Sequence, residues 1–504
     1  MAKAKKSKKG KKSKKKSDPL LDGTGKEVTI EQLNKETLRG YLKSCKEKSL
    51  TPVKSFASAL STAMEEEKLL HSIAFKEEVT HHQLDEILEA ISHYNQFYTL
   101  CFLGMPLGDR GLRSVLTHHQ LDEILEAISH YNQFYTLCFL GMPLGDRGLR
   151  SVCRFLTKDI VLRNLEIMDS GVTEIGCSMI AAALQRNSTL QKLTLDHNLF
   201  GNFGIRELSG GIAQNTTLKE LNLQYCDIDE EGIQFLGASV PYSGLDKLVL
   251  HGNNLGNAGA YALFRQFAEC AAQRLEKRRS DIEMRVSDKE KADAGRVEAA
   301  TKAAALAAER RGASKEEIES IATAAAEEIM QLIKQESEED DSSVNLPELW
   351  GEAGAECPIV DIFSAPLISL TSLDLSSCSL TSDASLMQSI FAVLQPNEEG
   401  ICACPRLENI DLSGNFFEEP NLFLDLCLAC PQLSKLKLNW ATVPKMLSKQ
   451  IITQTKRNAL NIKKVKKKKA LKDKSKKKKG KKGKKGKKGK RGKKGKKGKK
   501  GKKK

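Results

Sequence analysis

Apolar residues recur along most of this chain in one fixed frame, Leu-x-x-Leu-x-Leu-x-x-(Asn/Cys)-x-Leu. Clear copies run from Leu190 to Phe200 and from Leu218 to Ile228, and the frame begins at positions 162, 190, 218 and 245. The alternating Leu-x-Leu step predicts a short strand with its leucines pointing inward, and the apolar stretch after it predicts a helix. Because each unit can bury its apolar side only against its neighbours, the period of 27 or 28 residues predicts a solenoid.

The frame resembles that of leucine-rich-repeat proteins of the ribonuclease-inhibitor type. Cys226 stands where Asn198 stands, as the alternation of Asn and Cys in that subclass allows. The resemblance covers roughly residues 65–265 and 365–445. It implies an α/β fold, a leucine-rich-repeat solenoid (horseshoe) with strands on the concave side and helices on the convex side. It implies little about function, because the same framework serves many unrelated partners.

Two stretches of the chain, Thr80–Val115 and Thr117–Val152, are identical, whereas the other repeats share only their leucine frame. The identity indicates a recent in-frame duplication or an error in assembling the gene, and the sequence does not separate the two. The extra copy is out of phase with the repeat by about a third of a unit. We therefore expect one copy to fit the solenoid and the other to strain or bulge it.

Composition outside the repeats predicts helical and disordered segments. Thr29 and Ser314 each begin a capping-box pattern, with Gln or Glu three residues later, so we expect a helix after each. The predicted segments are a disordered basic tail (1–28), a helical N-terminal cap (29–69), leucine-rich repeats (70–267, with the duplicated segment 80–152), a charged Ala-rich helical insertion (268–352), further repeats with a C-terminal cap (353–462), and a disordered poly-Lys/Gly tail (463–504). We interpret the insertion as a helical hairpin or extended arm; a flexible linker with transient helices is the alternative.

Positive charge is concentrated at the two ends of the chain. Residues 1–16 contain 10 Lys, and residues 463–504 contain 29 Lys and Arg against one Asp, so a net charge of +17 leaves about −21 on residues 17–462. Such tails favour a polyanionic partner: nucleic acid such as RNA, an anionic membrane, or acidic protein tails such as those of microtubules. Binding to nucleic acid would have no sequence preference and would be sensitive to salt. They could equally act as nuclear localisation signals or fold back onto the acidic body.

Several features bear on the compartment. No apolar segment follows Met1, and no stretch reaches the length of a membrane span, so we expect neither secretion nor a span. The 13 cysteines are scattered through repeat positions and are typical of buried thiols in an intracellular protein. The expected location is cytoplasmic, with the cytoskeleton or cilium favoured; the nucleus or nucleolus is the alternative.

The motifs that could indicate chemistry have simpler explanations. Cys404 and Cys430 have near neighbours Cys402 and Cys427, a spacing compatible with zinc, but each lies three residues before a repeat strand, the place that Asn187 occupies in another unit. We therefore expect structural thiols and no metal. Because no catalytic triad or nucleotide-binding loop is complete, we also expect no cofactor, no small-molecule substrate and no enzymatic activity.

The strand positions that face outward are the candidate binding residues. Large amphipathic side chains such as Tyr and Trp often become the anchors of an interface. The predicted protein-binding residues of the concave face are Glu166, Met168, Asp196, His197, Gln224, Tyr225, His251 and Trp440. Carboxylates outnumber cations in the earlier units, so a basic or mixed partner surface is favoured.

These observations predict a non-enzymatic scaffold or adaptor. The repeats would supply protein–protein contact and the polybasic tails would anchor the assembly, in a cytoskeletal or ciliary setting similar to that of leucine-rich-repeat components of axonemes. The alternative is a nuclear or nucleolar RNA-associated protein. Weaker alternatives are an enzyme inhibitor or a GTPase regulator similar to the Ran GTPase-activating proteins. The sequence leaves the partner, the organelle and the oligomeric state open.

Overall fold

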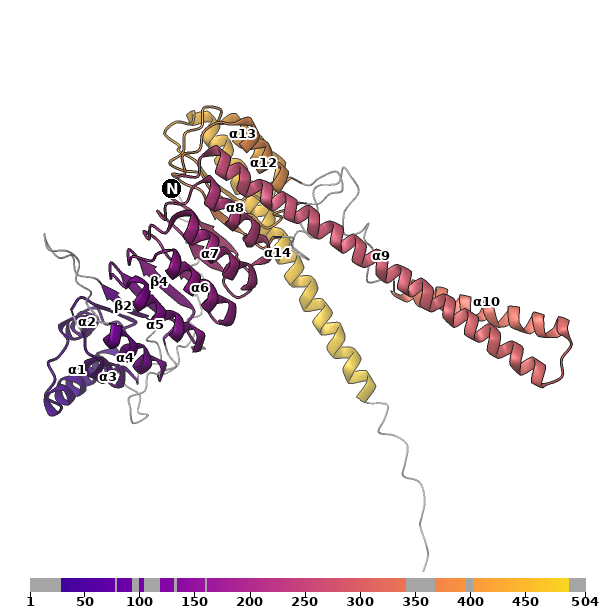
Figure 1. Cartoon of the computed structure of the whole chain (residues 1–504), viewed down its shortest axis with the longest axis horizontal. Helices are drawn as coiled ribbons and strands as arrows, with labels where there is room; N and C mark the ends of the chain where they lie inside the picture. Colours follow the sequence, from indigo (N-terminus) through magenta and orange to yellow (C-terminus); the bar gives the residue numbers. More distant parts are fainter. Residues whose placement is uncertain are drawn as a thin grey trace, which may run out of the picture. The chain divides into compact units, whose positions relative to one another are not determined.

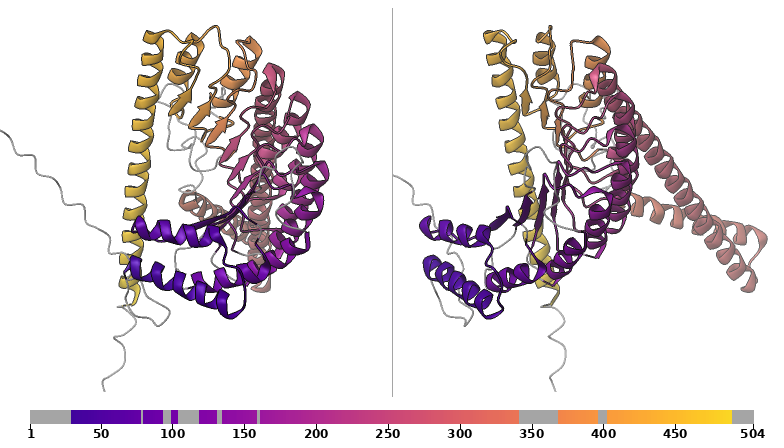
Figure 2. Two further views of the ribbon diagram at one scale, coloured as in Figure 1. Left: turned by 90° about the vertical axis from the view of Figure 1, so that its left-hand side faces the viewer. Right: turned by 60° about the vertical axis from the view of Figure 1, so that its left-hand side comes forward.

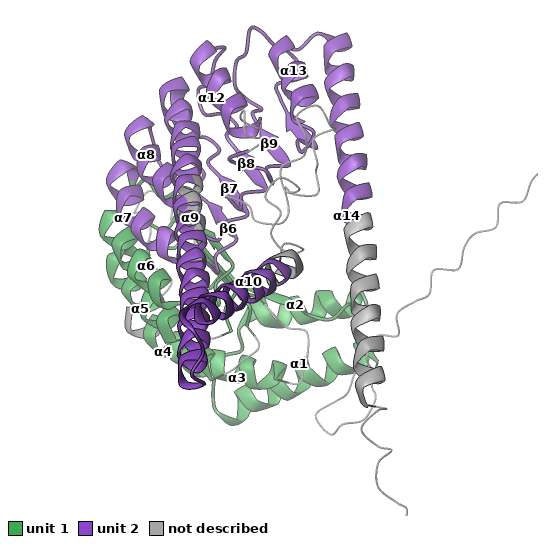
Figure 3. Cartoon of the chain, turned by 90° about the vertical axis from the view of Figure 1, so that its right-hand side faces the viewer, with its two compact units in different colours: residues 1–200 green, residues 201–504 purple. Residues whose placement is uncertain are grey.

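The computed structural model describes most of the chain between Thr29 and Lys488. The described residues are 29–77, 79–92, 99–103, 118–130, 134–158, 161–340, 368–395 and 402–488. They form two compact units, Met1–Phe200 and Gly201–Lys504 (Figure 3). The predicted disordered tail at 1–28, the end of the insertion at 341–352 and the last part of the C-terminal tail at 489–504 lie outside the described residues.

Unit 1 alternates strands and helices, as the repeat frame predicts. Its elements are α1 (Ile30–Glu47), α2 (Lys54–Glu65), β1 (Ser72–Phe75), α3 (His81–Ile91), β2 (Thr99–Leu103), α4 (His118–Ser129), β3 (Thr136–Leu140), α5 (Gly145–Lys158), β4 (Asn164–Met168), α6 (Glu174–Arg186) and β5 (Lys192–Thr194). The strands are parallel and follow one another in sequence order. The helices cover one face of this sheet and leave the other face open (Figure 1).

The first two helices pack against the start of the repeats. α1 begins with the capping box that the sequence predicts, since Thr29 and Gln32 exchange hydrogen bonds between side chain and backbone. Tyr41 of α1 is buried against Phe56 of α2, with ring centroids 4.8 Å apart, and its hydroxyl accepts a hydrogen bond of 2.8 Å from the backbone N–H of Val53. α1 also packs on α3, and α2 on β1. This is the arrangement expected of a helical cap.

Both copies of the duplicated segment supply a strand to the sheet. β2 and β3 pair in parallel, with each residue of β2 opposite its identical counterpart in β3, from Thr99↔Thr136 to Leu103↔Leu140. The expectation that one copy would strain or bulge the repeats is therefore wrong for the strands. The identical Leu-x-Phe alternation forces this register, because a shift by one residue would turn the buried side chains to the open face. Residues 104–117, between β2 and α4, lie outside the described residues.

Unit 2 continues the same alternation and contains the insertion. Its elements are α7 (Gly201–Gln214), β6 (Glu220–Asn222), α8 (Glu230–Ser239), a 3₁₀ turn η1 (Val240–Tyr242), β7 (Lys247–Val249), α9 (Gly256–Arg310), α10 (Lys315–Asp340), β8 (Ser372–Asp374), α12 (Ala384–Leu394), β9 (Asn409–Asp411), α13 (Asn421–Ala429), β10 (Lys435–Lys437) and α14 (Lys445–Lys488). The five strands are parallel and again follow sequence order. Figure 2 shows strands and helices as two layers.

A buried asparagine joins successive repeats of unit 2. Oδ1 of Asn253 accepts hydrogen bonds from the backbone N–H groups of Cys226 (3.0 Å) and Ile228 (3.2 Å), and Nδ2 donates to the carbonyls of Leu223 (2.7 Å) and Leu250 (2.8 Å). The amide thus satisfies four backbone groups that the turn would otherwise bury without partners. This network explains why the frame requires a polar residue at an otherwise apolar turn.

Cysteine at the same place in the frame makes only part of this network. Sγ of the buried Cys378 lies 3.3 Å from the carbonyl oxygen of Leu250 and 3.4 Å from that of Ser376, and its single hydrogen can point to only one of them at a time. A thiol is also a weak acceptor, so it satisfies one carbonyl and contacts the neighbouring N–H groups only weakly. The Asn and Cys alternation of the sequence therefore has a direct hydrogen-bonding basis.

The insertion forms a helical hairpin between β7 and β8. α9 runs for 55 residues without a break, so the insertion begins as an extension of a repeat helix and not at a boundary near residue 268. The chain reverses at Gly312, which has φ +77°, and Ser314 and Glu317 form the predicted capping box of α10. α10 then packs back along α9 (Figure 1).

The last helix is longer than the sequence predicts. α14 buries Leu447, Ile451, Thr455, Asn458 and Ile462 along one side, a spacing of three or four residues that matches a helix packed on the repeats. It continues to Lys488, into the segment expected to be disordered from residue 463. Lysine has a high helix propensity, which favours continuation of the helix as far as Lys479, after which a glycine recurs every third residue. None of the described helices is long and apolar enough to cross a membrane.

Candidate protein-binding face

The open face of the unit 2 sheet carries rows of side chains from successive strands. In each strand the central apolar residue is buried among the repeats and its neighbours lie on the open face. The parallel register places these neighbours side by side. The central row is Asn222, Val249, Asp374, Asp411 and Lys437. The repeat thus brings residues that are far apart in sequence into one row, in which Asn222 and Val249 are buried and the three residues from Asp374 onward are charged.

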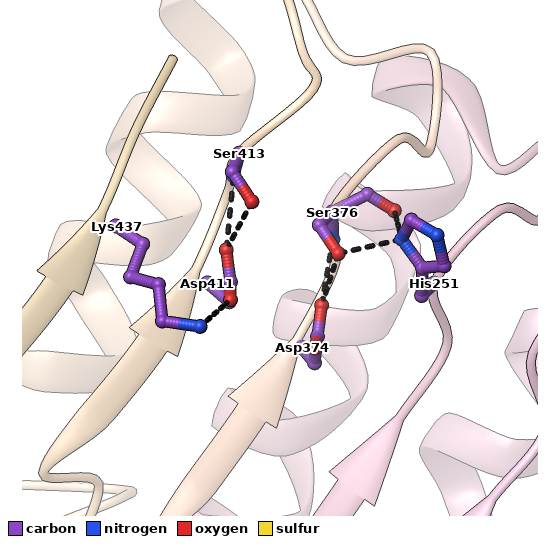
Figure 4. Close-up of polar contacts among 6 residues, drawn as sticks. All are labelled: His251, Asp374, Ser376, Asp411, Ser413 and Lys437. Atoms are coloured by element: carbon purple, nitrogen blue, oxygen red, sulfur yellow. Dashed lines mark hydrogen bonds and ion pairs between the residues drawn. The ribbon is translucent and has the colours of Figure 1, made fainter. Parts of the chain in front are cut away.

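Four side chains of this face are linked by hydrogen bonds. The hydroxyl of Tyr225 lies 2.9 Å from Nε2 of His251, and Nδ1 of His251 lies 2.7 Å from Oγ of Ser376. Oγ of Ser376 in turn donates to Oδ1 of Asp374 at 2.5 Å (Figure 4). The Tyr225 and His251 rings meet edge to face, with centroids 5.0 Å apart. We call these four residues the Tyr–His–Ser–Asp row.

The hydrogen bonds of this row determine which ring nitrogen of His251 carries the proton. Because the hydroxyl hydrogen of Ser376 goes to Asp374, Nδ1 of His251 must donate to Oγ, and it also lies 3.1 Å from the Ser376 carbonyl. In the neutral ring Nε2 is then the acceptor for the Tyr225 hydroxyl. The serine proton points away from the histidine, so the row lacks the serine-to-imidazole hydrogen bond of a nucleophilic triad. The row fixes four side chains in place and does not activate one of them.

Gly252 makes room for the ring of Tyr225. Tyr225 itself has a left-handed backbone, with φ 52°, which places its ring over the next repeat. A Cβ at Gly252 would lie 2.2 Å from the Tyr225 ring, and Gly252 has φ +74°, a conformation that other residues rarely adopt. The glycine therefore determines where the most exposed member of the row can lie.

A second polar group lies on the neighbouring strands. Oδ1 of Asp411 accepts from the backbone N–H (3.1 Å) and hydroxyl (2.6 Å) of Ser413, and Oδ2 is 2.5 Å from Nζ of Lys437 (Figure 4). Burial alone would raise the pKa of the Asp411 carboxyl, but the hydrogen bonds from Lys437 and Ser413 outweigh it and lower the pKa. The hydrogen bond to Asp411 raises the pKa of Lys437. Both groups are therefore charged at neutral pH.

The residues predicted from the sequence fall into three environments. Tyr225 and His197 are exposed, and Tyr225 and His251 meet in the Tyr–His–Ser–Asp row. Glu166, Met168, Gln224, His251 and Trp440 are partly buried, and Glu166 forms an ion pair of 2.6 Å with Lys192. Asp196 is 6% exposed, so this residue offers little surface to a partner, contrary to expectation. It lies in the turn that follows β5.

Sequence reasoning missed the two serines and the lysine of this face. Ser376 and Ser413 each follow an aspartate by two residues, in Asp374-Leu-Ser376 and in Asp411-Leu-Ser413. The same Asp-x-Ser pattern at the same place in two repeats could have indicated them. Elsewhere, burial raises the pKa of the Cys404 and Cys427 thiols, to about 12 for Cys427. The described residues contain no group of His, Cys, Asp and Glu that could hold a metal.

Comparisons with known proteins agree with this architecture. One family of repeats, described as Leucine Rich repeat, matches residues 214–237, and another, described as Leucine Rich Repeat, matches residues 369–390. The chain contains leucine-rich repeats and has the fold of a leucine-rich-repeat solenoid. Repeats of this kind are a framework for protein–protein interaction. The two matches do not assign the ribonuclease-inhibitor subtype.

Solved structures similar to this leucine-rich-repeat protein are distant. Leiomodin-1 actin-binding site 2 is 18% identical, with a TM-score of 0.23, over 28% of this chain and 78% of that one. A yeast complex of Rad7 and Elc1 is 10% identical, with a TM-score of 0.33, over 82% and 91%. At these scores neither likeness bears on function. No curated protein matches the sequence.

Proposed function

We propose that this leucine-rich-repeat protein, which resembles the ribonuclease-inhibitor type, is a non-enzymatic scaffold or adaptor that binds a protein partner through the open face of its repeats. The observation that carries the proposal is the Tyr–His–Ser–Asp row. Its side chains are held by hydrogen bonds of 2.5 to 2.9 Å, so they lose little freedom when a partner binds. Tyr225, with 41% of its surface exposed, supplies an aromatic anchor at one end.

The charges of this face favour a basic partner surface. Asp374 and Asp411 lie opposite each other on neighbouring strands, and Lys437 forms an ion pair with Asp411. An arginine or lysine of the partner could approach Asp374 at one end of the row, while the Tyr225 ring at the other end offers a face for a cation–π contact with a second cation. This combination would discriminate against an acidic partner, since a second carboxylate would be repelled.

Anchoring to a polyanion is the second part of the proposal. α14 presents exposed lysines at 463, 464, 466 and 467 and continues into the lysine-rich sequence to Lys488. Many lysines in one segment give sequence-independent, salt-sensitive binding. We favour the acidic tails of microtubules, in the cytoplasm or cilium. RNA in the nucleus or nucleolus is the alternative, and the weaker alternatives are enzyme inhibition and GTPase regulation.

The binding face is tested by proximity labelling with the full chain in its source cells. The variant Tyr225→Ala removes the anchor, and Tyr261→Ala is the matched control, because Tyr261 lies on α9 outside the sheet and is 37% exposed. We expect Tyr225→Ala to lose a defined set of labelled proteins that the wild type and Tyr261→Ala share. Identical labelling by all three proteins would contradict the proposed face.

The anchor is tested by location. Tagged full-length protein is compared with a shortened chain of residues 17–462, which lacks both lysine-rich ends. If both mark microtubules or cilia, the repeats carry the targeting and the adaptor proposal stands. If the intact protein fills the nucleolus and the shortened one disperses, the lysine-rich ends determine the location and the RNA-associated alternative replaces it.

A further inference from the structure

Two cysteines stand side by side on the open face of the unit 1 sheet. Cys101 of β2 and Cys138 of β3 are the same residue in the two copies of the duplicated segment, and the register pairs them directly. The residues that flank them, Leu100 and Phe102 in β2, are buried on the opposite face. Because side chains alternate along a strand, both thiols lie on the open face, at the same register position of the two strands.

The geometry of this pair matches that of a disulfide. Neighbouring strands lie about 4.8 Å apart, and the Cα atoms of a disulfide are usually about 4.4–6.8 Å apart. The side chains of Cys101 and Cys138 are close enough to lower the pKa of one thiol and raise that of the other. Both cysteines are free thiols in the structure. The Cβ atoms of a disulfide lie about 3.5–4.5 Å apart, slightly less than the strand spacing, so the bond would draw the two strands slightly together.

The two thiols differ in pKa and in exposure, as expected of a pair in which one thiol attacks an oxidant and the other resolves the product. The hydrogen bond from Cys138 lowers the pKa of Cys101, whereas the pKa of Cys138 is raised, first by the same hydrogen bond and then by burial. Cys101 is half-buried and Cys138 is 5% exposed. Since the thiolate is the nucleophile, Cys101 is the attacking residue and Cys138 is the resolving one.

We propose that Cys101 and Cys138 form a vicinal dithiol that hydroperoxides oxidise to a disulfide across β2 and β3. The Cys101 thiolate attacks one peroxide oxygen; the S–O bond forms, the O–O bond breaks, and the leaving oxygen takes up a proton as water or alcohol. The Cys138 thiol then attacks the sulfenic sulfur, the S–S bond forms, and the hydroxyl leaves with the thiol proton as water. Two electrons pass from the two sulfurs to the peroxide.

The site exists because of the duplication. In the register of the sheet, Ala74 of β1 lies beside Cys101, and Glu166 of β4 lies beside Cys138. A chain with one copy would therefore place the single cysteine between an alanine and a glutamate. The second copy replaces one of these neighbours with another thiol and creates a chemical group that no other pair of described strands repeats.

Peptide mapping of the full-length protein tests the proposal. Reduced protein is treated with stoichiometric hydrogen peroxide, alkylated, and cut with trypsin, which places Cys101 in the peptide 77–110 and Cys138 in the peptide 114–147. We expect these two peptides to be joined by a disulfide after oxidation and separated again by a thiol reductant. The two copies are distinguishable because the flanking residues differ.

Three variants provide the controls. Cys138→Ser should leave a sulfenic acid at Cys101 that dimedone traps, and Cys101→Ser should abolish both products. Cys153→Ser should leave the cross-link unchanged, because Cys153 is buried in α5, where burial raises its pKa to about 12. Oxidation that links either cysteine to another residue, or that leaves the two peptides separate in folded wild-type protein, would overturn the proposal. Circular dichroism of each variant shows that the fold is retained.

Discussion

Replacing Asn253 by alanine should destabilise unit 2 more than any exposed substitution in the same turn. The side chain is 2% exposed and makes four hydrogen bonds, two as acceptor and two as donor. At roughly 1 kcal/mol for each net hydrogen bond, the loss is about 4 kcal/mol. Desolvated backbone groups left without partners can only increase this value.

The variant Asn253→Cys distinguishes the hydrogen bonds that Asn253 donates from those that it accepts. In Asn253→Cys the thiol can still donate to one carbonyl, as Cys378 does to Leu250, but it is only a weak acceptor for the N–H groups of Cys226 and Ile228. The variant keeps one of the four hydrogen bonds at full strength, so the expected loss in the free energy of unfolding is about 3 kcal/mol, smaller than that of the alanine variant. The chain itself has Cys at this position in two repeats, Cys226 and Cys378, which is consistent with such an intermediate value.

The assay combines urea unfolding with hydrogen exchange. Unfolding of the full chain, followed by circular dichroism, gives the free energy, and exchange resolved to peptides follows the amides of Cys226 and Ile228. Asn254→Ala is the matched control, because Asn254 is the next residue and is exposed; its loss should stay below about 0.5 kcal/mol. If Asn253→Ala loses no more than this control, or if the cysteine variant is as unstable as the alanine variant, the hydrogen-bond argument fails.

Three further outcomes follow from the structure. Gly252→Ala should displace the Tyr225 ring, because its Cβ would lie 2.2 Å from that ring, and a crystal structure or the tyrosine side-chain NMR signals would show an unmoved ring if the steric argument is wrong. The pKa of Asp411 is lower in the folded protein than in the unfolded chain, where it is about 3.9, so the ionised carboxylate stabilises the fold at pH values above 3.9. This stabilisation is lost as the pH falls through the pKa of the folded state. The difference in unfolding free energy between wild type and Asp411→Asn, measured with urea, should therefore shrink at acid pH, and a difference that stays constant would contradict this prediction. Ser314→Ala removes the cap of α10 and should cost about 1 kcal/mol locally; faster hydrogen exchange confined to the first turn of α10 supports this, and unchanged exchange does not.

The repeat frame predicted those parts of the fold that depend on local sequence. Leucines at fixed spacing gave the strands and their buried faces, and the capping boxes at Thr29 and Ser314 gave the starts of α1 and α10. These predictions succeed because the interactions join residues within one turn or one unit. The start of the arm was not predictable, since the alanine-rich stretch after Gly256 continues the helix with no break signal.

The candidate site depends on pairing between distant segments. His251 and Ser376 are 125 residues apart in sequence and meet because β7 pairs with β8 across the whole insertion. The frame could place each residue on the open face, but the contact requires the register of two strands separated by the arm. The prediction that Asp196 is available to a partner was wrong because the repeat frame shows only that this residue follows the strand. Its burial depends on the conformation of the turn, which the frame does not specify.

The point at which the helical hairpin is inserted leaves the open face of unit 2 uninterrupted. The insertion extends α9, on the helical side of the repeat, and the chain returns to β8 with the same kind of register that joins the other strands, Lys247↔Ser372 and Leu248↔Leu373. An insertion within the strand or its turn would have separated His251 from Ser376. Placed in the helix, it adds a long hairpin while the row of the open face stays continuous. A mutation in the hairpin should therefore leave the open face intact.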